Sequence, residues 1–249
     1  DAGYDIEQLD EYLMASFAPT VNQQVLEKFG KENGSGMTDA QAEEIMQKYE
    51  GSDIKSFAEE YRKEVTQKSL QMMYDSGLIS KELYDKFSTQ KDLYVPLKRD
   101  KDTTRKGRGT GQGYSVTGRG IKARKGRTTL AASPFVNGLL DFQDTVVRSE
   151  KNKVGQSVLK FAEAFPDYKA PNGKPLFEVR SQQYIPVYDK NGEIDFFNRR
   201  YKIEDNELSV WVDGKQKIIT INDDSLARGL KNLGLERGVK FLNTANTFL

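Results

Sequence analysis

The residues best suited to chemistry lie in one basic, glycine-rich stretch from Lys98 to Arg127. It holds eleven Lys/Arg against two Asp, a net charge of about +9, together with seven glycines. Lys and Arg neutralise phosphate charge, and glycines let main-chain N–H groups approach an anion closely. The stretch therefore predicts contact with nucleic-acid phosphates or with an acidic protein surface. The residues expected to bind nucleic acid are Lys98, Arg99, Arg105, Lys106, Arg108, Arg119, Lys122, Arg124, Lys125 and Arg127.

This stretch does not match a known phosphate-binding motif. The spacing from Gly107 to Gly113 lacks the Gly-Lys-Ser/Thr ending of a P-loop and is not a dinucleotide fingerprint. Tyr114 is its only aromatic residue, which gives little support to base stacking. Because little of the stretch is apolar, we expect a mobile loop that binds without sequence preference. The alternative is a tether that docks on the rest of the chain, which holds 27 basic and 35 acidic residues.

Other combinations of residues argue against catalysis. The chain has no His and no Cys, which removes the commonest general base, the commonest metal ligand and any thiolate. The acidic pairs Glu43-Glu44 and Glu59-Glu60 diverge by about 100° on a helix, and Asp223-Asp224 suits a helix cap. We expect no catalytic residue, cofactor or metal, and interpret this segment as not an enzyme. An enzyme that uses carboxylates and Lys alone stays an alternative, and it would need a cleft where acids converge.

Two further groups of side chains have more than one interpretation. Arg148, Glu150, Lys151 and Asn152 interrupt an otherwise apolar helix. They predict a buried polar network that fixes packing, an exposed face, or a ligand site. The aromatic residues of the last third suit a core and cross-strand pairs, or else a recognition surface. They are Tyr184, Tyr188, Phe196, Phe197, Tyr201 and Trp211.

Helices are predicted for the part of the chain that precedes the basic stretch. Apolar spacing predicts a helix over 4–29, which Pro19 either kinks or divides into two. A flexible joint over 30–36 precedes a helix with a capping box at Thr38. A longer helix begins at Ile54 and ends before Gly77, and a short helix over 81–87 follows.

The part after the basic stretch mixes helix and strand. Ser133-Pro134 starts a long helix that runs to about Phe165. Strands are predicted at 177–179 and 184–188, and a hairpin joins 208–212 to 215–221 through a type I′ turn at Asp213-Gly214. A last helix begins at Asn222-Asp223. The predicted fold class is α+β, mostly helical, with a small antiparallel hairpin or sheet in the C-terminal third.

These elements predict three parts. A helical part covers 1–97, the basic loop covers 98–132, and a long helix with the small sheet and the last helices covers 133–249. We expect the chain to be a fragment of a larger protein. No apolar run approaches the roughly 20 residues that span a bilayer, so no membrane-spanning segment is expected.

Several short motifs, taken in order, resemble one family. They are Tyr12–Pro19 with Asn22, Gly34–Thr38, Asp75–Ser80, Tyr94–Leu97 before the basic stretch, Arg148–Gly155, and Val212–Lys215 leading to Leu226–Leu230. In this order the chain resembles the large-polyvalent-protein-associated domains of bacteriophages and prophages over nearly its whole length. Many members of that family have a histidine at the position of Phe17 and an arginine at that of Val21, so this chain departs from the pattern there.

The resemblance implies a non-catalytic structural or interaction module of a large phage protein that is packaged in the virion or ejected with the genome. Its partners would be other regions of the parent protein, other virion proteins and DNA, bound without sequence preference. Its location would be the virion interior or the host cell after ejection. The alternative is a nucleic-acid-binding accessory domain of a phage polymerase or anti-restriction protein.

Overall fold

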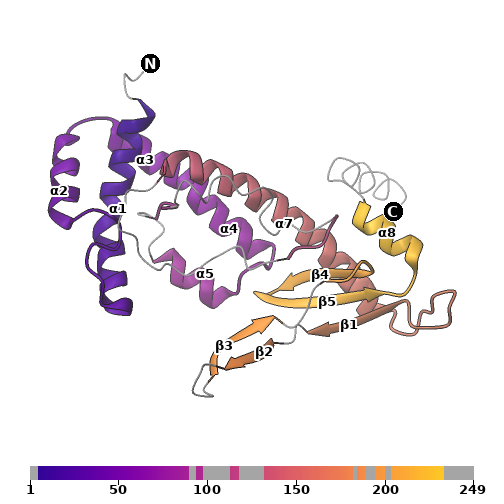
Figure 1. Cartoon of the computed structure of the whole chain (residues 1–249). Coiled ribbons are helices and arrows are strands. Elements are labelled where there is room, and N and C mark those ends of the chain that lie inside the picture. Colours follow the sequence, from indigo (N-terminus) through magenta and orange to yellow (C-terminus); the bar gives the residue numbers. More distant parts are fainter. Residues whose placement is uncertain are drawn as a thin grey trace. The chain divides into compact units, whose positions relative to one another are not determined.

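A computed structural model describes residues 5–89, 94–97, 113–117, 132–181, 184–188, 194–199 and 203–232. Helices predominate, and the strands are antiparallel and lie in the C-terminal third (Figure 1), which confirms the predicted α+β class. No helix among the described residues is both long enough and apolar enough to cross a membrane.

The chain divides into two compact units whose limits differ from the predicted parts. The first unit comprises 1–73, 82–108 and 119–146, and the second comprises 74–81, 109–118 and 147–249. One reason is that helix α7 (Pro134–Ala164) is continuous across the boundary at 146/147, so it contributes residues to both units. A second reason is that the turn at 74–81 bonds to the sheet, through the Gly214 N–H and the Gly77 carbonyl at 3.0 Å.

The first unit is helical. It contains α1 (Ile6–Phe29), α2 (Asp39–Lys48), α3 (Ile54–Tyr61), the π-helix η1 (Arg62–Gln67), most of α4 (Lys68–Asp75), all of α5 (Lys81–Ser88) except Lys81, and the start of α7. Its core is formed by apolar side chains of α1 and α3 together with Tyr49 and Val95. Phe17 and Val21 are fully buried in this core, so apolar side chains suit these positions.

Most of the predicted helix limits of the first unit are confirmed. Asp5 and Gln8 form a capping box at α1, and Thr38 and Gln41 form the predicted one at α2. Helix α1 passes through Pro19, so the alternative of two separate helices is wrong. The predicted helix from Ile54 to the residues before Gly77 is present, although η1 interrupts its α-helical bonding.

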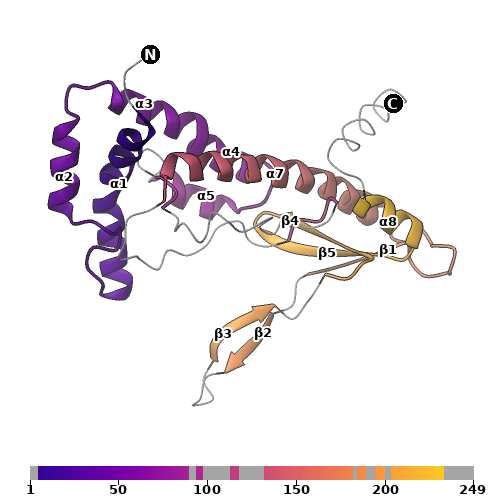
Figure 2. The ribbon, with the colours of Figure 1, turned by 45° about the horizontal axis from the view of Figure 1, so that its top comes forward.

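The second unit is built around a three-stranded antiparallel sheet of order β1-β5-β4, formed by β1 (Phe177–Ser181), β5 (Lys215–Ile221) and β4 (Glu207–Val212). A separate two-stranded sheet joins β2 (Tyr184–Tyr188) and β3 (Ile194–Arg199), and Figure 2 shows it apart from the larger sheet. Helix α8 (Asp224–Asn232) follows β5. Leu159 of α7, Leu208, Val210, Ile219, Ile221 and Ala227 form the buried core of this unit.

The local signals of the second unit are confirmed. Asp213 and Gly214 both have positive φ, 49° and 70°, as a type I′ turn between β4 and β5 requires. Ser133 caps α7 through the Val136 N–H at 3.1 Å, and Asp223 caps α8 through the Leu226 N–H at 2.7 Å. The side chains of β2 and β3 lie outside the described residues, so the alternatives for their aromatic residues stay open. Trp211 is buried, at 3% exposure.

Candidate functional site

The ten basic residues predicted to bind nucleic acid lie outside the described residues. They are Lys98, Arg99, Arg105, Lys106, Arg108, Arg119, Lys122, Arg124, Lys125 and Arg127. Of the stretch that contains them, only Gly113 to Thr117 is described. The nucleic-acid interface therefore stays a prediction, and the structure bears on how its centre is held.

Residues 113–117, which we call the anchor segment, are packed into the second unit. Tyr114 and Val116 are buried, and Tyr114 joins the apolar core of the sheet. Burial raises the pKa of the Tyr114 phenol. For these five residues the expectation of a mobile loop, made because little of the stretch is apolar, is wrong. A short Tyr-Ser-Val-Thr run has high strand propensity, which is the one sequence signal of this packing.

Hydrogen bonds join the anchor segment to strand β4. The Val116 N–H donates to the Ser209 carbonyl at 2.9 Å, and the Ser209 N–H donates to Ser115 Oγ at 3.0 Å. The Val116 carbonyl accepts from Ser209 Oγ at 2.7 Å and from Trp211 Nε1 at 2.9 Å. The anchor segment thus covers the edge of β4 and divides the basic stretch into two runs.

Asn152 is the centre of the polar patch predicted on the long helix. It is fully buried. Its Nδ2 donates to the Ser76 carbonyl at 2.7 Å and to the Trp211 carbonyl at 2.8 Å, and its Oδ1 accepts from the Trp211 N–H at 2.8 Å. Gln156 Nε2 donates to the same two carbonyls, at 2.9 and 2.8 Å. The amide of Asn152 therefore connects α7, the 74–81 turn and β4.

The other members of the patch have separate positions. Arg148 is buried and donates to the Thr117 carbonyl at 3.4 Å, while Ser149 accepts from Ser76 Oγ at 3.1 Å. Glu150 is exposed and pairs with Lys153 at 2.7 Å. Burial lowers the pKa of Lys151. Of the alternatives left open by the sequence, the buried network describes Arg148 and Asn152, which the neighbouring Ser149 joins, and the exposed face describes Glu150.

A second polar junction lies in the first unit and involves Asn22 of α1. Its Oδ1 accepts from the Ser35 N–H at 2.8 Å, and its Nδ2 donates to the Met37 carbonyl at 3.0 Å and to Asp39 Oδ1 at 2.7 Å. A Cβ added at Gly34 would overlap the side chain of Val25. The predicted flexible joint over 30–36 is therefore wrong for Gly34 and Ser35, which are held against α1.

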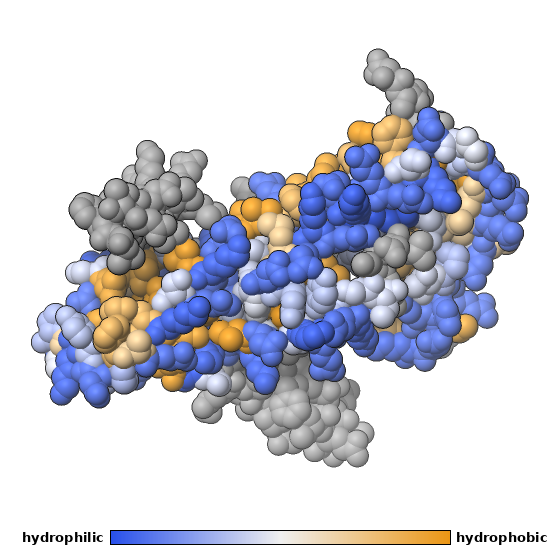
Figure 3. All heavy atoms as spheres, turned by 180° about the vertical axis from the view of Figure 1, so that it is seen from behind, coloured by the Kyte–Doolittle hydropathy of each residue, from blue (hydrophilic) through white to orange (hydrophobic). Residues whose placement is uncertain are grey.

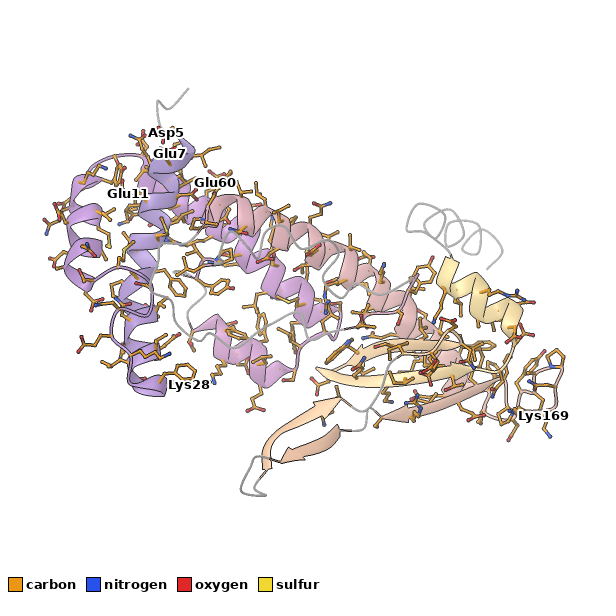
Figure 4. All side chains as sticks on the ribbon, in the orientation of Figure 1. Asp5, Glu7, Glu11, Lys28, Glu60 and Lys169 are labelled. Atoms are coloured by element: carbon orange, nitrogen blue, oxygen red, sulfur yellow. The ribbon has the colours of Figure 1, made fainter. Side chains whose placement is uncertain are left out.

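An ion pair joins the amino-terminal half of α1 to the end of α2. Figure 4 shows Asp5, Glu7 and Glu11 along the first turns of α1. Glu11 accepts from Lys48 Nζ at 2.8 Å and from the Tyr49 hydroxyl at 2.6 Å. The hydrogen bond from Lys48 and then that from Tyr49 hold the pKa of Glu11 below its ordinary value of 4.5.

The predicted absence of converging acids can be examined only within the described residues. There, no group of three or more acidic side chains lies close enough to hold a metal ion. The hollows there include two shallow ones. One of about 270 Å³ in the first unit is lined by Lys63, Gln67, Lys68, Leu70, Gln71, Tyr84 and Ser88. One of about 360 Å³ in the second unit is lined by Tyr74, Asp75, Gly77, Ile79, Gln156, Val212 and Asp213.

Several side chains that line these two hollows form contacts within the chain. In the first, Lys68 pairs with Glu64, and the Tyr84 hydroxyl donates to Gln71 Oε1 at 2.6 Å. In the second, Gln156 is held by the Ser76 and Trp211 carbonyls. The Gln156 contacts position main-chain segments, whereas the contacts of the first hollow join side chains.

Comparison with known proteins adds no family to this description. The chain matches no protein-family model, no curated protein and no solved structure. Its function must therefore be argued from its own residues.

The motifs that carry the family resemblance are brought together in two places. In the first unit, Asn22 bonds to the Gly34–Thr38 motif. In the second unit, Asn152 bonds to the Asp75–Ser80 motif and to Trp211, which directly precedes Val212–Lys215. In both places a buried side-chain amide fixes a loop to a helix. The hydrogen bonds of Asn22 and Asn152 hold these loops in position, a role that the sequence did not reveal.

Proposed function

We propose that this chain is a non-catalytic interaction module that binds nucleic acid through the basic stretch 98–127. The observation that carries the proposal is the charge of that stretch, eleven Lys/Arg against two Asp, and the anchor segment 113–117 holds its centre on β4. Six Lys/Arg precede the anchor segment within the stretch and five follow it. A fixed centre flanked by two basic runs can neutralise several phosphates at once.

The family resemblance supports a place for this module inside a large phage protein that is packaged in the virion or ejected with the genome. In that setting the module would contact the genome without sequence preference, since phosphate contacts carry no base information. The buried networks of Asn22 and Asn152 support a structural role, because their donors and acceptors are used to position loops.

The test is duplex DNA affinity measured by fluorescence anisotropy over a salt series. Deleting 98–127 would remove Tyr114 and Val116 from the core, so substitution is the better perturbation. One variant replaces the six Lys/Arg of 98–112 with Gln, and a second replaces the five of 118–127. The control replaces six exposed lysines elsewhere: Lys28, Lys31, Lys55, Lys63, Lys86 and Lys160.

Each neutralised phosphate contributes roughly −0.9 to the slope of log affinity against log salt. Both stretch variants should bind more weakly and with a shallower slope, while the control keeps most of the wild-type slope. Equal losses in all three variants would mean that only overall charge matters, and the proposal would fail. Absence of DNA binding at low salt, with binding to polyglutamate, would assign the stretch to an acidic protein partner.

A further inference from the structure

The two edges of the three-stranded sheet differ in how their main-chain groups are used. Strand β4 forms one edge and β1 the other (Figure 1). On β4, the outward groups of Ser209 bond to the anchor segment, and those of Trp211 bond to Asn152. Side chains and a packed segment therefore close this edge, which is one way that proteins prevent strands from pairing with other chains.

The register of β5 shows which groups of β1 face outward. The Ile221 N–H donates to Asn206, on the β4 side, while the Asn222 N–H donates to Leu176, on the β1 side. Because successive residues of a strand alternate, Thr220 and Ile218 bond toward β1, opposite Glu178 and Arg180.

It follows that the N–H and C=O groups of Phe177, Val179 and Ser181 point away from β5. Among the described residues, no main-chain bond to these groups is formed from that side. Strand β1 thus presents a short open edge, where a further strand can pair.

Apolar side chains lie beside this open edge. Val179 is 39% exposed, and Phe161 and Phe165 of α7 are 48% and 52% exposed. The ring centroids of Phe161 and Phe165 are 4.8 Å apart, and those of Phe161 and Phe177 are 5.9 Å apart. The aromatic cluster therefore continues from α7 onto β1. Figure 3 shows one face of the molecule, where hydrophobic residues gather in patches among hydrophilic ones. An exposed aromatic cluster such as that of Phe161 and Phe165 is a candidate contact surface.

The sequence of β1 is complementary to itself. Phe-Glu-Val-Arg-Ser places opposite charges on either side of Val179. If two copies of β1 pair antiparallel with the two-fold axis at Val179, each Glu178 lies opposite Arg180 of the partner subunit. Within each chain Arg180 also pairs with Glu207, and Glu178 accepts from Asn222 Nδ2 at 2.7 Å, so the charge pair between copies would add to these contacts. Opposite charges directly across a strand pair are stabilising, whereas like charges are destabilising. A shift of register by two residues would lose both of these charge pairs.

We propose that the open edge of β1 is an interface for a second copy of this chain, which pairs antiparallel about Val179. The two sheets then form one six-stranded sheet. In this register Val179 exchanges both main-chain bonds with the partner subunit's Val179, and Phe177 exchanges both with the partner subunit's Ser181. All the outward groups of the edge are thereby used, and the interface is isologous, as two-fold symmetry requires.

The register can be tested with single cysteines, because the chain has none of its own. Residues in a hydrogen-bonded antiparallel pair have Cα atoms about 5.5 Å apart, within the range that a disulfide bridges. Val179→Cys should therefore give a disulfide-linked dimer under mild oxidation. In the same register, the two copies of Ser181 are four residues apart along the pair, roughly 14 Å. Ser181→Cys should stay monomeric on a non-reducing gel.

Either the same degree of cross-linking in both variants or cross-linking in neither would overturn the proposal. The first result would indicate random collision, and the second would indicate that the edge does not pair. Cross-linking of Ser181→Cys alone would also overturn it, because the register would then be different.

A second measurement follows association directly, by light scattering coupled to size exclusion over a range of concentrations. Val179→Pro removes an outward N–H and costs no bond to β5, so the fold should be retained while the dimer is lost. Val179→Thr keeps the N–H and the β-branched shape, and should stay dimeric. Unchanged Trp211 fluorescence verifies that the proline variant is folded. A folded proline variant that still dimerises would overturn the proposal.

The charge complementarity has its own variant. Glu178→Lys places a Lys opposite the partner's Arg180 at both of the symmetry-related positions. The dissociation constant of the dimer should therefore rise about tenfold or more. Asp167→Lys makes the same change of charge at an exposed position in the connection between α7 and β1, and should leave the dimer unchanged. Equal weakening by the two substitutions would contradict pairing about Val179.

Discussion

The side-chain amide of Asn152 takes the place of a neighbouring strand for Trp211. It accepts the Trp211 N–H at 2.8 Å and donates to the Trp211 carbonyl at 2.8 Å. Both outward groups of this edge residue are thus satisfied by one side chain that itself is fully buried. A helix residue therefore sets the position of β4, and the same amide also holds the Ser76 carbonyl at 2.7 Å.

Asn152→Ala should strongly destabilise the second unit. The substitution removes three hydrogen bonds and leaves a buried N–H without its acceptor, so we expect a loss of about 2–4 kcal/mol in the free energy of unfolding. Trp211 is the only tryptophan of the chain, so its fluorescence in urea reports this unit. Lys153→Ala, one residue away and exposed, is the control and should cost little. A loss no larger than that of the control would show that the network contributes nothing to stability.

The turn between β4 and β5 should depend on Gly214 for space as well as for conformation. A Cβ at Gly214, where φ is +70°, would lie 2.7 Å from the Ser80 N, whereas one at Gly173, where φ is +80°, meets nothing within 4 Å. Both alanine substitutions incur the cost of positive φ, of about 1–2 kcal/mol. Gly214→Ala should destabilise the second unit by a further 1 kcal/mol or more, about the cost of overpacking. Urea unfolding followed by Trp211 fluorescence measures the stability of Gly214→Ala and Gly173→Ala. Equal losses in the free energy of unfolding would contradict the steric argument.

Glu11 should make the stability of the first unit sensitive to acid. Its pKa is below 4.5 in the folded chain because Lys48 and Tyr49 donate to the carboxylate. A carboxyl group with a lowered folded-state pKa contributes stability above its unfolded pKa and loses it as the pH falls through the folded value. We expect the contribution to be intact at pH 7 and to disappear progressively below about pH 4.5.

The comparison is between wild type and Glu11→Gln, by urea unfolding followed with far-ultraviolet circular dichroism at pH 7 and pH 3. Wild type should be the more stable at pH 7, and the difference should narrow at pH 3. Glu44→Gln, at an exposed position on α2, is the control. If the difference in stability between wild type and Glu11→Gln is the same at pH 7 and pH 3, the ion pair is not its cause.

Local features of the sequence predicted local structure well. The capping box at Thr38, the Ser133 cap and the Asp213-Gly214 turn depend on residues only a few positions apart, and all three are confirmed. The burial of Val116 was missed because it depends on the edge of β4, more than ninety residues away in the chain. No periodicity within a Gly-rich basic stretch records such a contact.

In the candidate site, too, the sequence predicted local features but not the contacts made by distant segments. The patch at Arg148 and Asn152 was recognisable because polar residues interrupt an apolar helix, yet its role could not be chosen. That choice depends on which main-chain groups lie opposite, namely those of Ser76 and Trp211, and these come from distant segments. The charge of the basic stretch was countable from the sequence, and its contact with nucleic acid stays a prediction.

The close approach of Gly34 to Val25 should behave as a coupled pair. Gly34→Ala alone should destabilise the first unit by about 1–3 kcal/mol, since the added methyl group overlaps a fully packed valine. Val25→Ala alone should also destabilise it, because it leaves a cavity beside α1. In the double variant the new methyl group partly fills that cavity, so the combined loss should be smaller than the sum by at least about 0.5 kcal/mol.

Urea unfolding followed by circular dichroism measures all three variants. Gly30→Ala combined with Val25→Ala is the matched control, because a Cβ at Gly30 meets nothing within 4 Å, and its two losses should add. Additive losses for Gly34 and Val25 as well would mean that the two residues do not touch. The contact between the Gly34–Thr38 motif and α1 would then depend on the hydrogen bonds of Asn22 alone.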